Sequence, residues 1–394
     1  MSEQPRVGNA ELLDSYSENL LGVYGMPQTV LVRGEGCRVW DADGQEYLDL
    51  LAGIAVNSCG HAHPELVSAL TQQAATLGHV SNFFASPAQI AAAETVNRIL
   101  PVRGKVLFVN SGTEANEAAL KVARAHRSGG RIVALRNAFH GRTLGSLSVT
   151  WKPAYREPFE PLIPGVVFIE ATTAALTQAM SEDVAAIIVE PIQGEAGVID
   201  LPTDFLKRAR QLADHYGALL ILDEVQTGIG RTGDWFGFSA SGIIPDVVTM
   251  AKGLGGGFPV GAMALLTPAA QQALGTGMHG TTFGGNPLAG AMVQATLKTI
   301  LKEGLLDHAR LLGAAWSDEL IQLPQVSSVS GRGLLLGVHL APGISAKVVS
   351  KVMFKHGIIV NAPTEQVLRL APPLIINKTE CDQFTTALSA WEVK

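Results

Sequence analysis

Between about residues 64 and 285, short apolar runs alternate with amphipathic helical stretches. The apolar runs predict six strands, at residues 106–110, 131–135, 165–169, 185–190, 218–223 and 246–251. Several of these runs are apolar throughout, as expected for strands that helices cover on both faces. The alternation predicts an α/β domain with a doubly wound, mostly parallel sheet, whose ligands bind beyond the carboxyl ends of its strands.

The two ends of the chain show a different pattern. Short strand-like runs separated by turns predict small antiparallel pairs near the N-terminus, at residues 30–32, 37–40 and 47–50. The last hundred residues combine a long helix, two glycine-rich strands, a helix near 346–356, another strand and a closing helix. We therefore expect a large domain at residues 61–285 and a small α+β domain at residues 286–394, which the segment 1–60 joins.

Composition narrows the class of protein. Of 394 residues, 47% are hydrophobic and 16% are charged, a balance that excludes disorder and requires a large core. The 29 basic and 35 acidic residues give a net charge of −6, which suits small-molecule chemistry rather than nucleic-acid binding. No apolar run approaches the roughly 18 residues of a membrane span, and no secretory signal is expected from the first residues, which have no basic region followed by an apolar stretch. Three cysteines without a C-x-x-C pair favour a reducing compartment, so a cytoplasmic enzyme is expected.

The best phosphate-binding candidate follows the first predicted strand. Two G-x-G-x-x-G patterns, at 228–233 and 275–280, do not predict a dinucleotide site, because neither lies between a strand and a helix. The segment 109–114 does lie between a strand and a helical run, and free N–H groups at a helix start bind phosphate. The same residues also fit an ordinary capping box between Ser111 and Glu114.

Polar side chains follow three other predicted strands. Asp223 and Glu190 each end a strand, which places both at the ligand-binding edge of the sheet. Asp223 would stay ionised beside a cation such as a protonated ring nitrogen, or could cap a helix. Lys252 lies before a run of glycines that leave room for a bulky group, and its amine could form a Schiff base. A solvated loop lysine is the alternative.

One further loop adds an aromatic ring, Phe139, and a guanidinium, Arg142, which suits bidentate binding of a carboxylate. His61 and His63 lack a third ligand nearby, so no metal site is predicted. A phosphate loop, a flat ring, an acidic partner for a pyridinium and a reactive lysine together describe the needs of pyridoxal phosphate (PLP).

Six motifs in order carry a family resemblance: SGTEANEAA, NAFHGRT, VEPIQGE, LDEVQTGIGRTG, MAKGLGGGFP and HGTTFGGNPLAG. From about residue 16 onward, the chain resembles the class III PLP-dependent aminotransferases, and within them the group that acts on N-acetylornithine. The resemblance implies fold type I, with a large doubly wound PLP-binding domain and a small α+β domain. It also implies a homodimer with shared active sites.

The resemblance assigns roles around the cofactor ring. Lys252 matches the lysine that holds PLP covalently and moves the substrate proton. Asp223 would pair with the pyridine nitrogen, and Gln226 would reach the phenolic oxygen. Val225 and Phe139 would cover the two faces of the ring.

The resemblance also assigns the phosphate site. Ser111, Gly112 and Thr113 would hold the phosphate, and Thr282 would complete the site from the neighbouring subunit. Glu224, within the same motif as Asp223, is counted with the cofactor-binding residues.

The substrates are implied to be amino acids and 2-oxo acids. Arg142 matches the arginine that takes the substrate carboxylate, and Thr281 would touch the substrate. Arg369 matches the arginine that holds the α-carboxylate of glutamate and 2-oxoglutarate. Glu195 would neutralise that arginine when the other substrate is bound.

The implied reaction moves an amino group from N2-acetyl-L-ornithine to 2-oxoglutarate, in arginine biosynthesis. Ile54 stands where related ornithine aminotransferases have a tyrosine, which argues against free ornithine. Succinyl-diaminopimelate, succinylornithine and 4-aminobutyrate stay open as alternative substrates. An aminomutase is less favoured, because it would not need Arg369 and Glu195 for an incoming 2-oxoglutarate. A catalytically silent cofactor-binding protein is less favoured, because Lys252 and Asp223 are both present.

Overall fold

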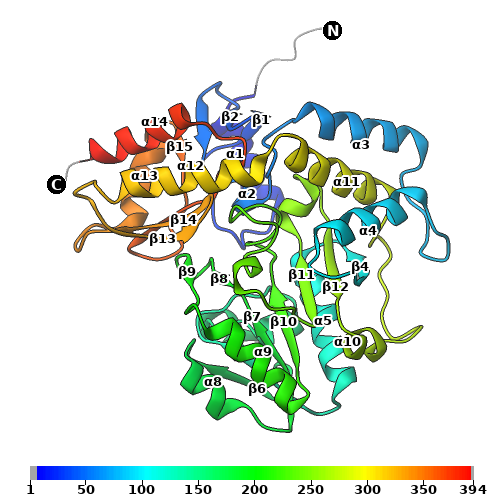
Figure 1. Ribbon diagram of the computed structural model, residues 1–394. Helices are drawn as coiled ribbons and strands as arrows, with labels where there is room; N and C mark the ends of the chain where they lie inside the picture. Colours follow the sequence, from blue (N-terminus) through cyan, green and yellow to red (C-terminus); the bar gives the residue numbers. More distant parts are fainter. Residues whose placement is uncertain (1–6, 392–394) are drawn as a thin grey trace.

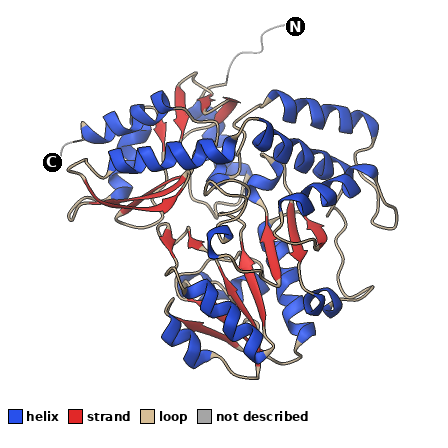
Figure 2. Cartoon of the chain, viewed as in Figure 1, coloured by secondary structure: helices blue, strands red, loops and turns tan. Residues whose placement is uncertain are grey.

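The computed structural model describes residues 7–391. Residues 1–6, at the N-terminus where no secretory signal is expected, lie outside the described range. Within that range, no helix combines the length and the apolar character needed to cross a bilayer. A large lobe surrounds a seven-stranded sheet, and a smaller lobe brings the first strands of the chain together with its C-terminal helices (Figure 1, Figure 2).

The large sheet has the strand order β4-β12-β11-β10-β7-β5-β6. Its strands are β4 (Lys105–Val109), β5 (Arg131–Leu135), β6 (Val166–Ile169), β7 (Val184–Val189), β10 (Leu219–Asp223), β11 (Val247–Met250) and β12 (Gly261–Leu265). Only β12 is antiparallel to its neighbours, so the predicted mostly parallel sheet is confirmed. Strand β12 was not predicted from the sequence, because no crossover helix separates it from β11.

Helices cover both faces of this sheet. The helices packed on it include α5 (Gly112–His126), α8 (Thr173–Ala179), α9 (Phe205–Tyr216) and α10 (Pro268–Ala273). In β7, Ile187 and Val189 belong to one apolar cluster, whereas Ala186 and Ile188 belong to the cluster under α5. Since successive side chains of a strand point to opposite faces, a strand covered on both faces is apolar at every position.

The small lobe contains two sheets. The first consists of β1 (Leu31–Glu35), β2 (Arg38–Asp41), β3 (Glu46–Asp49) and β15 (Ile358–Ile359), and the second of β13 (Val326–Arg332), β14 (Leu335–Leu340) and β16 (Val367–Leu370). The helix α11 (Pro287–Lys302) leads from the large lobe into the small one. The helices of the small lobe are α12 (Leu305–Leu320), α13 (Ala346–Lys355) and α14 (Lys378–Ser389). Ile358 in β15 pairs with Leu48 in β3, which ties the start of the chain to its end.

The remaining helices and strands lie before, between and beside these elements. These are α1 (Asn9–Asn19), α2 (Ala52–Ala55), α3 (Pro64–Thr76), α4 (Pro87–Ile99), α6 (Leu144–Ser148), α7 (Pro153–Arg156), β8 (Ile192–Gln193), β9 (Ile199–Asp200) and single 3₁₀ turns at 157–159, 239–241 and 252–255. All four residues of α2, including Ile54, have positive φ, a conformation that costs energy for a β-branched residue. Asp49 stabilises this left-handed turn, because its Oδ1 accepts hydrogen bonds from the backbone N–H groups of Leu51 and Ala52.

Candidate active site

A cavity of about 430 Å³ lies beyond the carboxyl ends of β4, β7, β10 and β11. Most of the predicted site residues line it: Ser111, Gly112, Thr113, Phe139, Arg142, Glu195, Asp223, Val225, Gln226 and Lys252. A wider groove of about 1230 Å³, on the small lobe, holds none of them. The cavity at the sheet edge is therefore the candidate active site.

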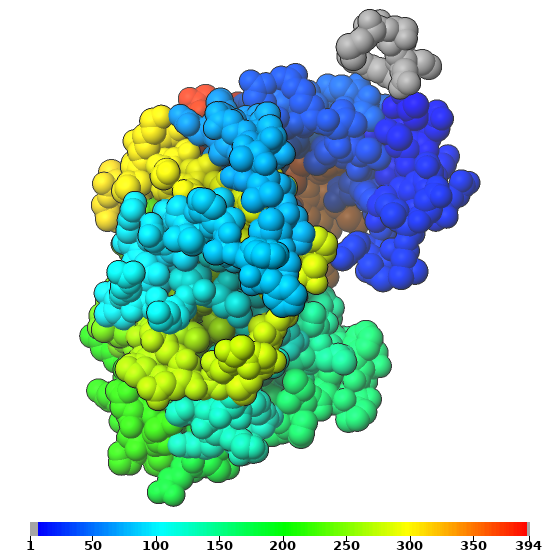
Figure 3. All heavy atoms as spheres, turned by 90° about the vertical axis from the view of Figure 1, so that its right-hand side faces the viewer, coloured from blue at the N-terminus to red at the C-terminus, as the bar shows by residue number. Residues whose placement is uncertain are grey.

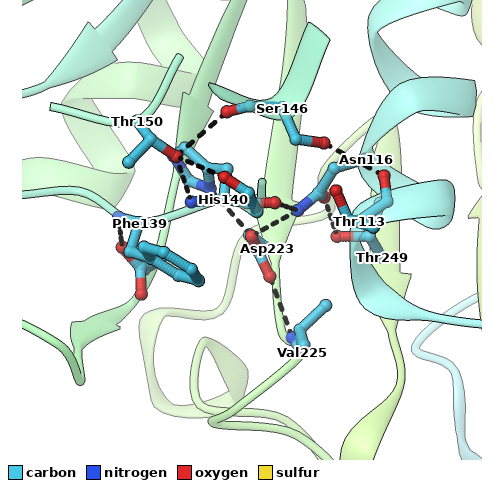
Figure 4. Close-up of polar contacts among 11 residues, drawn as sticks. Thr113, Asn116, Phe139, His140, Ser146, Thr150, Asp223, Val225 and Thr249 are labelled. Atoms are coloured by element: carbon cyan, nitrogen blue, oxygen red, sulfur yellow. Dashed lines mark hydrogen bonds and ion pairs between the residues drawn. The ribbon is translucent and has the colours of Figure 1, made fainter. Parts of the chain in front are cut away.

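Asp223 is the centre of a buried polar network at the end of β10 (Figure 4). Its Oδ2 accepts hydrogen bonds from Nδ2 of Asn116 at 2.8 Å and from Nδ1 of His140 at 2.7 Å, and its Oδ1 accepts one from the backbone of Val225 at 3.0 Å. The hydroxyl of Thr249 donates to Oδ1 of Asn116 at 2.7 Å. The orientation of the carboxylate is thus fixed before any ligand binds, and sequence reasoning missed both Asn116 and His140.

The His140 imidazole is the basic member of this network. Burial opposes its protonation, yet the hydrogen bond and the negative charge of Asp223 raise the pKa of His140 above its ordinary value. In the sequence, His140 could have been suspected only because it lies next to Phe139, in a loop that was predicted to contribute Phe139 and Arg142 to the site.

Lys252 follows β11, the strand beside β10, with a positive φ of 40°. Burial lowers the pKa of its ammonium group to about 8. The glycines after it differ in their surroundings. A Cβ atom on Gly253 would lie 2.5 Å from Oγ of Ser58, and one on Gly256 would lie 2.4 Å from Cδ2 of Leu66, so these two lie in a closely packed part of the loop. Gly257, by contrast, lines the cavity.

The start of α5 forms the candidate phosphate site. Ser111 caps the helix by accepting a hydrogen bond from the backbone of Glu114 at 3.2 Å. The Glu114 carboxylate, however, accepts from the backbone of Asn110 at 2.9 Å, so the reciprocal capping box is not formed. The N–H groups of the first helical turn have no partner within the helix and can bind an anion. A Cβ on Gly112 would lie 2.6 Å from Cγ1 of Val225, so only glycine fits there.

A second group of contacts positions Phe139 and Arg142. The backbone N–H of Phe139 donates to Oε1 of Glu190 at 2.9 Å, and burial raises the pKa of Glu190 to about 8. The Arg142 guanidinium lies over the ring of Tyr155, 3.5 Å from its centroid. Tyr155, in the short helix α7, gave no signal in the sequence because it lies outside every motif.

Arg369 and Glu195 meet across the two lobes. Arg369, on β16, is 1% exposed, and its Nη1 donates to Glu195 and, at 3.3 Å, to Oε1 of Gln226. Its Nη2 donates to Oδ1 of Asn361 at 2.8 Å. Burial raises the pKa of Glu195, but the charge of Arg369 and their hydrogen bond outweigh it, so the net pKa is lowered.

Four of the predicted site residues, Glu224, Thr281, Thr282 and Arg369, are not among the residues that line the cavity; Arg369 reaches it through its hydrogen bonds to Glu195 and Gln226, which do line it. The Glu224 carboxylate points into the protein, where it accepts hydrogen bonds from the Thr227 hydroxyl and two backbone N–H groups. Thr281 and Thr282 line a separate depression, and Ile54 is exposed on the strained turn.

No metal-binding group emerges among residues 7–391, where three or more His, Cys, Asp or Glu side chains never gather suitably. His61 bonds to Asp49 at 2.8 Å, and His63 bonds to Glu303 at 3.1 Å. His63 also lies directly before α3, which begins at Pro64.

The side chains present fit PLP. A buried carboxylate held by three donors suits a protonated ring nitrogen, a helix start that opens on the cavity suits a phosphate, and a lysine of lowered pKa suits an aldehyde. The fold and the site together define a PLP-dependent enzyme of fold type I.

Comparison with known proteins identifies the family. The model of the family described as aminotransferase class-III matches residues 23–391. An acetylornithine aminotransferase of Corynebacterium efficiens is 49% identical and one of Streptomyces coelicolor 48%, over 95% or more of both chains in each pair. Among solved structures, an ornithine aminotransferase of Toxoplasma gondii has a TM-score of 0.91 at 33% identity, covering 96% of this chain and 93% of that one.

A further solved structure, an (S)-enantioselective omega-transaminase of Thermomicrobium roseum, has a TM-score of 0.89 at 32% identity, with 98% of each chain covered. The chain belongs to the class III aminotransferase family. It is a PLP-dependent aminotransferase.

Proposed function

We propose that this aminotransferase exchanges the amino group of N2-acetyl-L-ornithine with 2-oxoglutarate, giving N-acetyl-L-glutamate 5-semialdehyde and L-glutamate, a step of arginine biosynthesis. The ion pair between Arg369 and Glu195, at a cavity that also contains Arg142, carries the proposal. The names of the relatives at 45–49% identity support the choice of substrate.

One site must accept two different amines. Glutamate has two carboxylates, whereas N-acetylornithine has one carboxylate and a neutral amide. Arg142 is available for the carboxylate that both share, because its stacking on Tyr155 uses the face of the guanidinium and leaves its edge donors free. Arg369 would bind the α-carboxylate of glutamate, and Glu195 would pair with it when the acylated substrate is bound. A buried, unpaired arginine would otherwise be costly.

The cofactor would be held by the residues already described. Asp223 would face the pyridine nitrogen, Phe139 and Val225 the two ring faces, and the first turn of α5 the phosphate. When bound, PLP withdraws electrons from the carbon that bears the amine and so acidifies its proton. Gln226, which also contacts Arg369, would reach the phenolic oxygen.

Lys252 is the group that we assign to proton transfer. Its lowered pKa, about 8, leaves a substantial neutral fraction near that pH, so Nζ can accept the proton of the amine-bearing carbon and return it. The charges of Glu195, Asp223 and Glu190 favour the protonated form and stop the pKa from falling further.

We also propose a homodimer with shared sites. Thr281 and Thr282 line a depression of about 980 Å³, together with residues of the segment 79–93. On the face in Figure 3 the segments near residues 80–95 (light blue) and 270–285 (yellow-green) lie side by side. Phe83 is 93% exposed and Phe283 58%, which supports a covering subunit. Thr282 of one subunit would then reach the phosphate site of its partner.

A cytoplasmic location is part of the proposal. Cys37, Cys59 and Cys381 are free and buried, and burial raises the pKa of the Cys59 and Cys381 thiols to about 12. Buried neutral thiols of this kind suit a reducing compartment.

The test is a panel of amine donors with 2-oxoglutarate as the acceptor. N2-acetyl-L-ornithine should give the highest kcat/KM, above succinylornithine, succinyl-diaminopimelate, ornithine and 4-aminobutyrate. The holoenzyme should be yellow and lose that colour with L-glutamate, and Lys252→Ala, the control, should not turn over. A preference for ornithine or 4-aminobutyrate would overturn the substrate assignment while leaving the family membership unaffected.

A further inference from the structure

Arg369 is held on two edges by groups of different charge. On the Nη1 edge lie Glu195, a carboxylate, and Gln226, an amide. On the Nη2 edge lies Oδ1 of Asn361, at 2.8 Å. The ion pair with Glu195 is therefore the one charged contact of this guanidinium among the described residues.

Asn361 is fixed to the arginine through its backbone as well. The backbone N–H of Arg369 donates to the carbonyl oxygen of Asn361 at 2.7 Å, and the two residues form an antiparallel bridge between β16 and the segment after β15. Its side chain is half-buried and bonds a guanidinium that is 1% exposed. The amide oxygen and the guanidinium are consequently held in register by the strand pairing itself.

The neutrality of Asn361 matters because Arg369 must alternate between two states. An amide oxygen orients a guanidinium without cancelling its charge, so the arginine stays attractive to a carboxylate when Glu195 withdraws. A carboxylate at position 361 would stay ionised beside the arginine and neutralise it permanently. Glutamate would then meet a site whose charge is already satisfied, while a substrate with a neutral tail would lose nothing.

We propose that Asn361 is a specificity-determining residue: it fixes Arg369 and leaves Glu195 as the only group that switches its charge. The proposal rests on the two-substrate function proposed above. If Asn361 has this role, the half-reaction with glutamate depends on an uncharged side chain that lies outside the six family motifs.

The main test is Asn361→Asp, which keeps the shape of the side chain and adds a charge. Single-turnover absorbance changes with each amine measure the two half-reactions separately. We expect kcat/KM for L-glutamate to fall about tenfold or more, mainly through KM, while the value for N-acetylornithine stays within about twofold. Asn377→Asp, a change at the helix cap of α14 remote from the cavity, is the matched control.

A double variant sharpens the test. Glu195→Gln alone should impair the N-acetylornithine half-reaction, because Arg369 is then unpaired beside a neutral tail. In Glu195→Gln with Asn361→Asp, the new carboxylate should restore that half-reaction while glutamate stays poor. A residue with a merely structural role would show no such rescue.

Glutarate, a dicarboxylate without an amine, gives a readout independent of turnover. Its inhibition constant against the holoenzyme should rise about tenfold in Asn361→Asp and less in Asn361→Ala, which removes the hydrogen bond but adds no charge. Equal losses in both half-reactions, or unchanged glutamate and glutarate binding in both variants, would overturn the proposal. Because glutarate binding needs no second substrate, failure of the acetylornithine assignment would be seen separately, in the donor panel.

Discussion

Nδ1 of His140 lies 2.7 Å from Oδ2 of Asp223, and neither side chain is more than 4% exposed. The two residues are 83 positions apart in the chain, on a loop after β5 and at the end of β10. Since Asn116 donates to the same oxygen, the carboxylate is anchored on one side and keeps its other oxygen near the cavity. His140 thus acts on the cofactor site through Asp223.

Replacing His140 by Phe should weaken cofactor binding without unfolding the protein. Loss of a hydrogen bond to a buried carboxylate costs about 1.5–3 kcal/mol, which as lost PLP binding corresponds to about a 10- to 150-fold higher Kd. Titration of the apoenzyme with PLP, followed by absorbance, measures this. His215→Phe, a change at an exposed histidine, is the control for His140→Phe. Asp223→Asn should remove most activity while the protein stays folded. Wild-type PLP affinity in His140→Phe would refute the positioning role.

The lowered pKa of Lys252 predicts how PLP uptake depends on pH. Below about pH 8 the amine is protonated and cannot attack an aldehyde, so the neutral fraction rises with pH up to that value. The rate of PLP uptake by the apoenzyme should rise up to tenfold per pH unit and level off above about pH 8. Stopped-flow absorbance measures it, and borohydride reduction with peptide mapping should label Lys252. A rise that continues to pH 10, as for an ordinary lysine, or a label elsewhere, would contradict the assignment.

Glu195→Gln tests the switch over Arg369 directly. The variant should keep or strengthen the glutamate half-reaction, because the arginine is permanently available to a carboxylate. The N-acetylornithine half-reaction should slow by about tenfold or more, since a buried arginine then lacks its counter-charge. Single-turnover measurements with each amine separate the effects. Equal slowing of both would show that Glu195 is not the switch.

Intersubunit complementation tests the shared site. Lys252→Ala and Thr282→Glu should each be inactive, the second because a carboxylate repels the phosphate. If Thr282 serves the partner's site, hybrid dimers carry one site with both defects and one intact site. Mixing equal amounts with subunit exchange should therefore restore about a quarter of wild-type activity. No recovery in hybrid dimers isolated with two affinity tags would place Thr282 at its own subunit's site. A fully active monomer in sedimentation would exclude the dimer.

Tyr155 is expected to orient Arg142 through the face of its ring. Tyr155→Leu removes the stacking and should raise KM for both amines about three- to tenfold, with kcat less affected. Tyr155→Phe keeps the ring and serves as the matched control, with KM within about twofold of the wild type. Equal losses in the two variants would point to the hydroxyl instead of the ring.

By itself, the sequence determined six of the seven strands of the large sheet and the residues at their ends. Six apolar runs mark these strands within one or two residues, because a strand covered on both faces is mostly apolar. Asp223, Lys252 and Ser111 were recognisable because each follows such a run at the edge where ligands bind. The proposed domain boundaries stay a prediction, although β3 and β15 pair across the whole length of the chain.

Tertiary structure decided which partners those residues have. Glu195 and Arg369 are 174 residues apart, and His140, Asn116 and Asp223 come from three different elements, so no local spacing announces their contacts. No local pattern announces β12 or the inward-facing carboxylate of Glu224 either. Asn361 reaches Arg369 only because the two residues pair in an isolated antiparallel bridge. Hydrophobic periodicity reports which face of an element is buried, whereas hydrogen bonds between distant side chains depend on how the buried faces pack together.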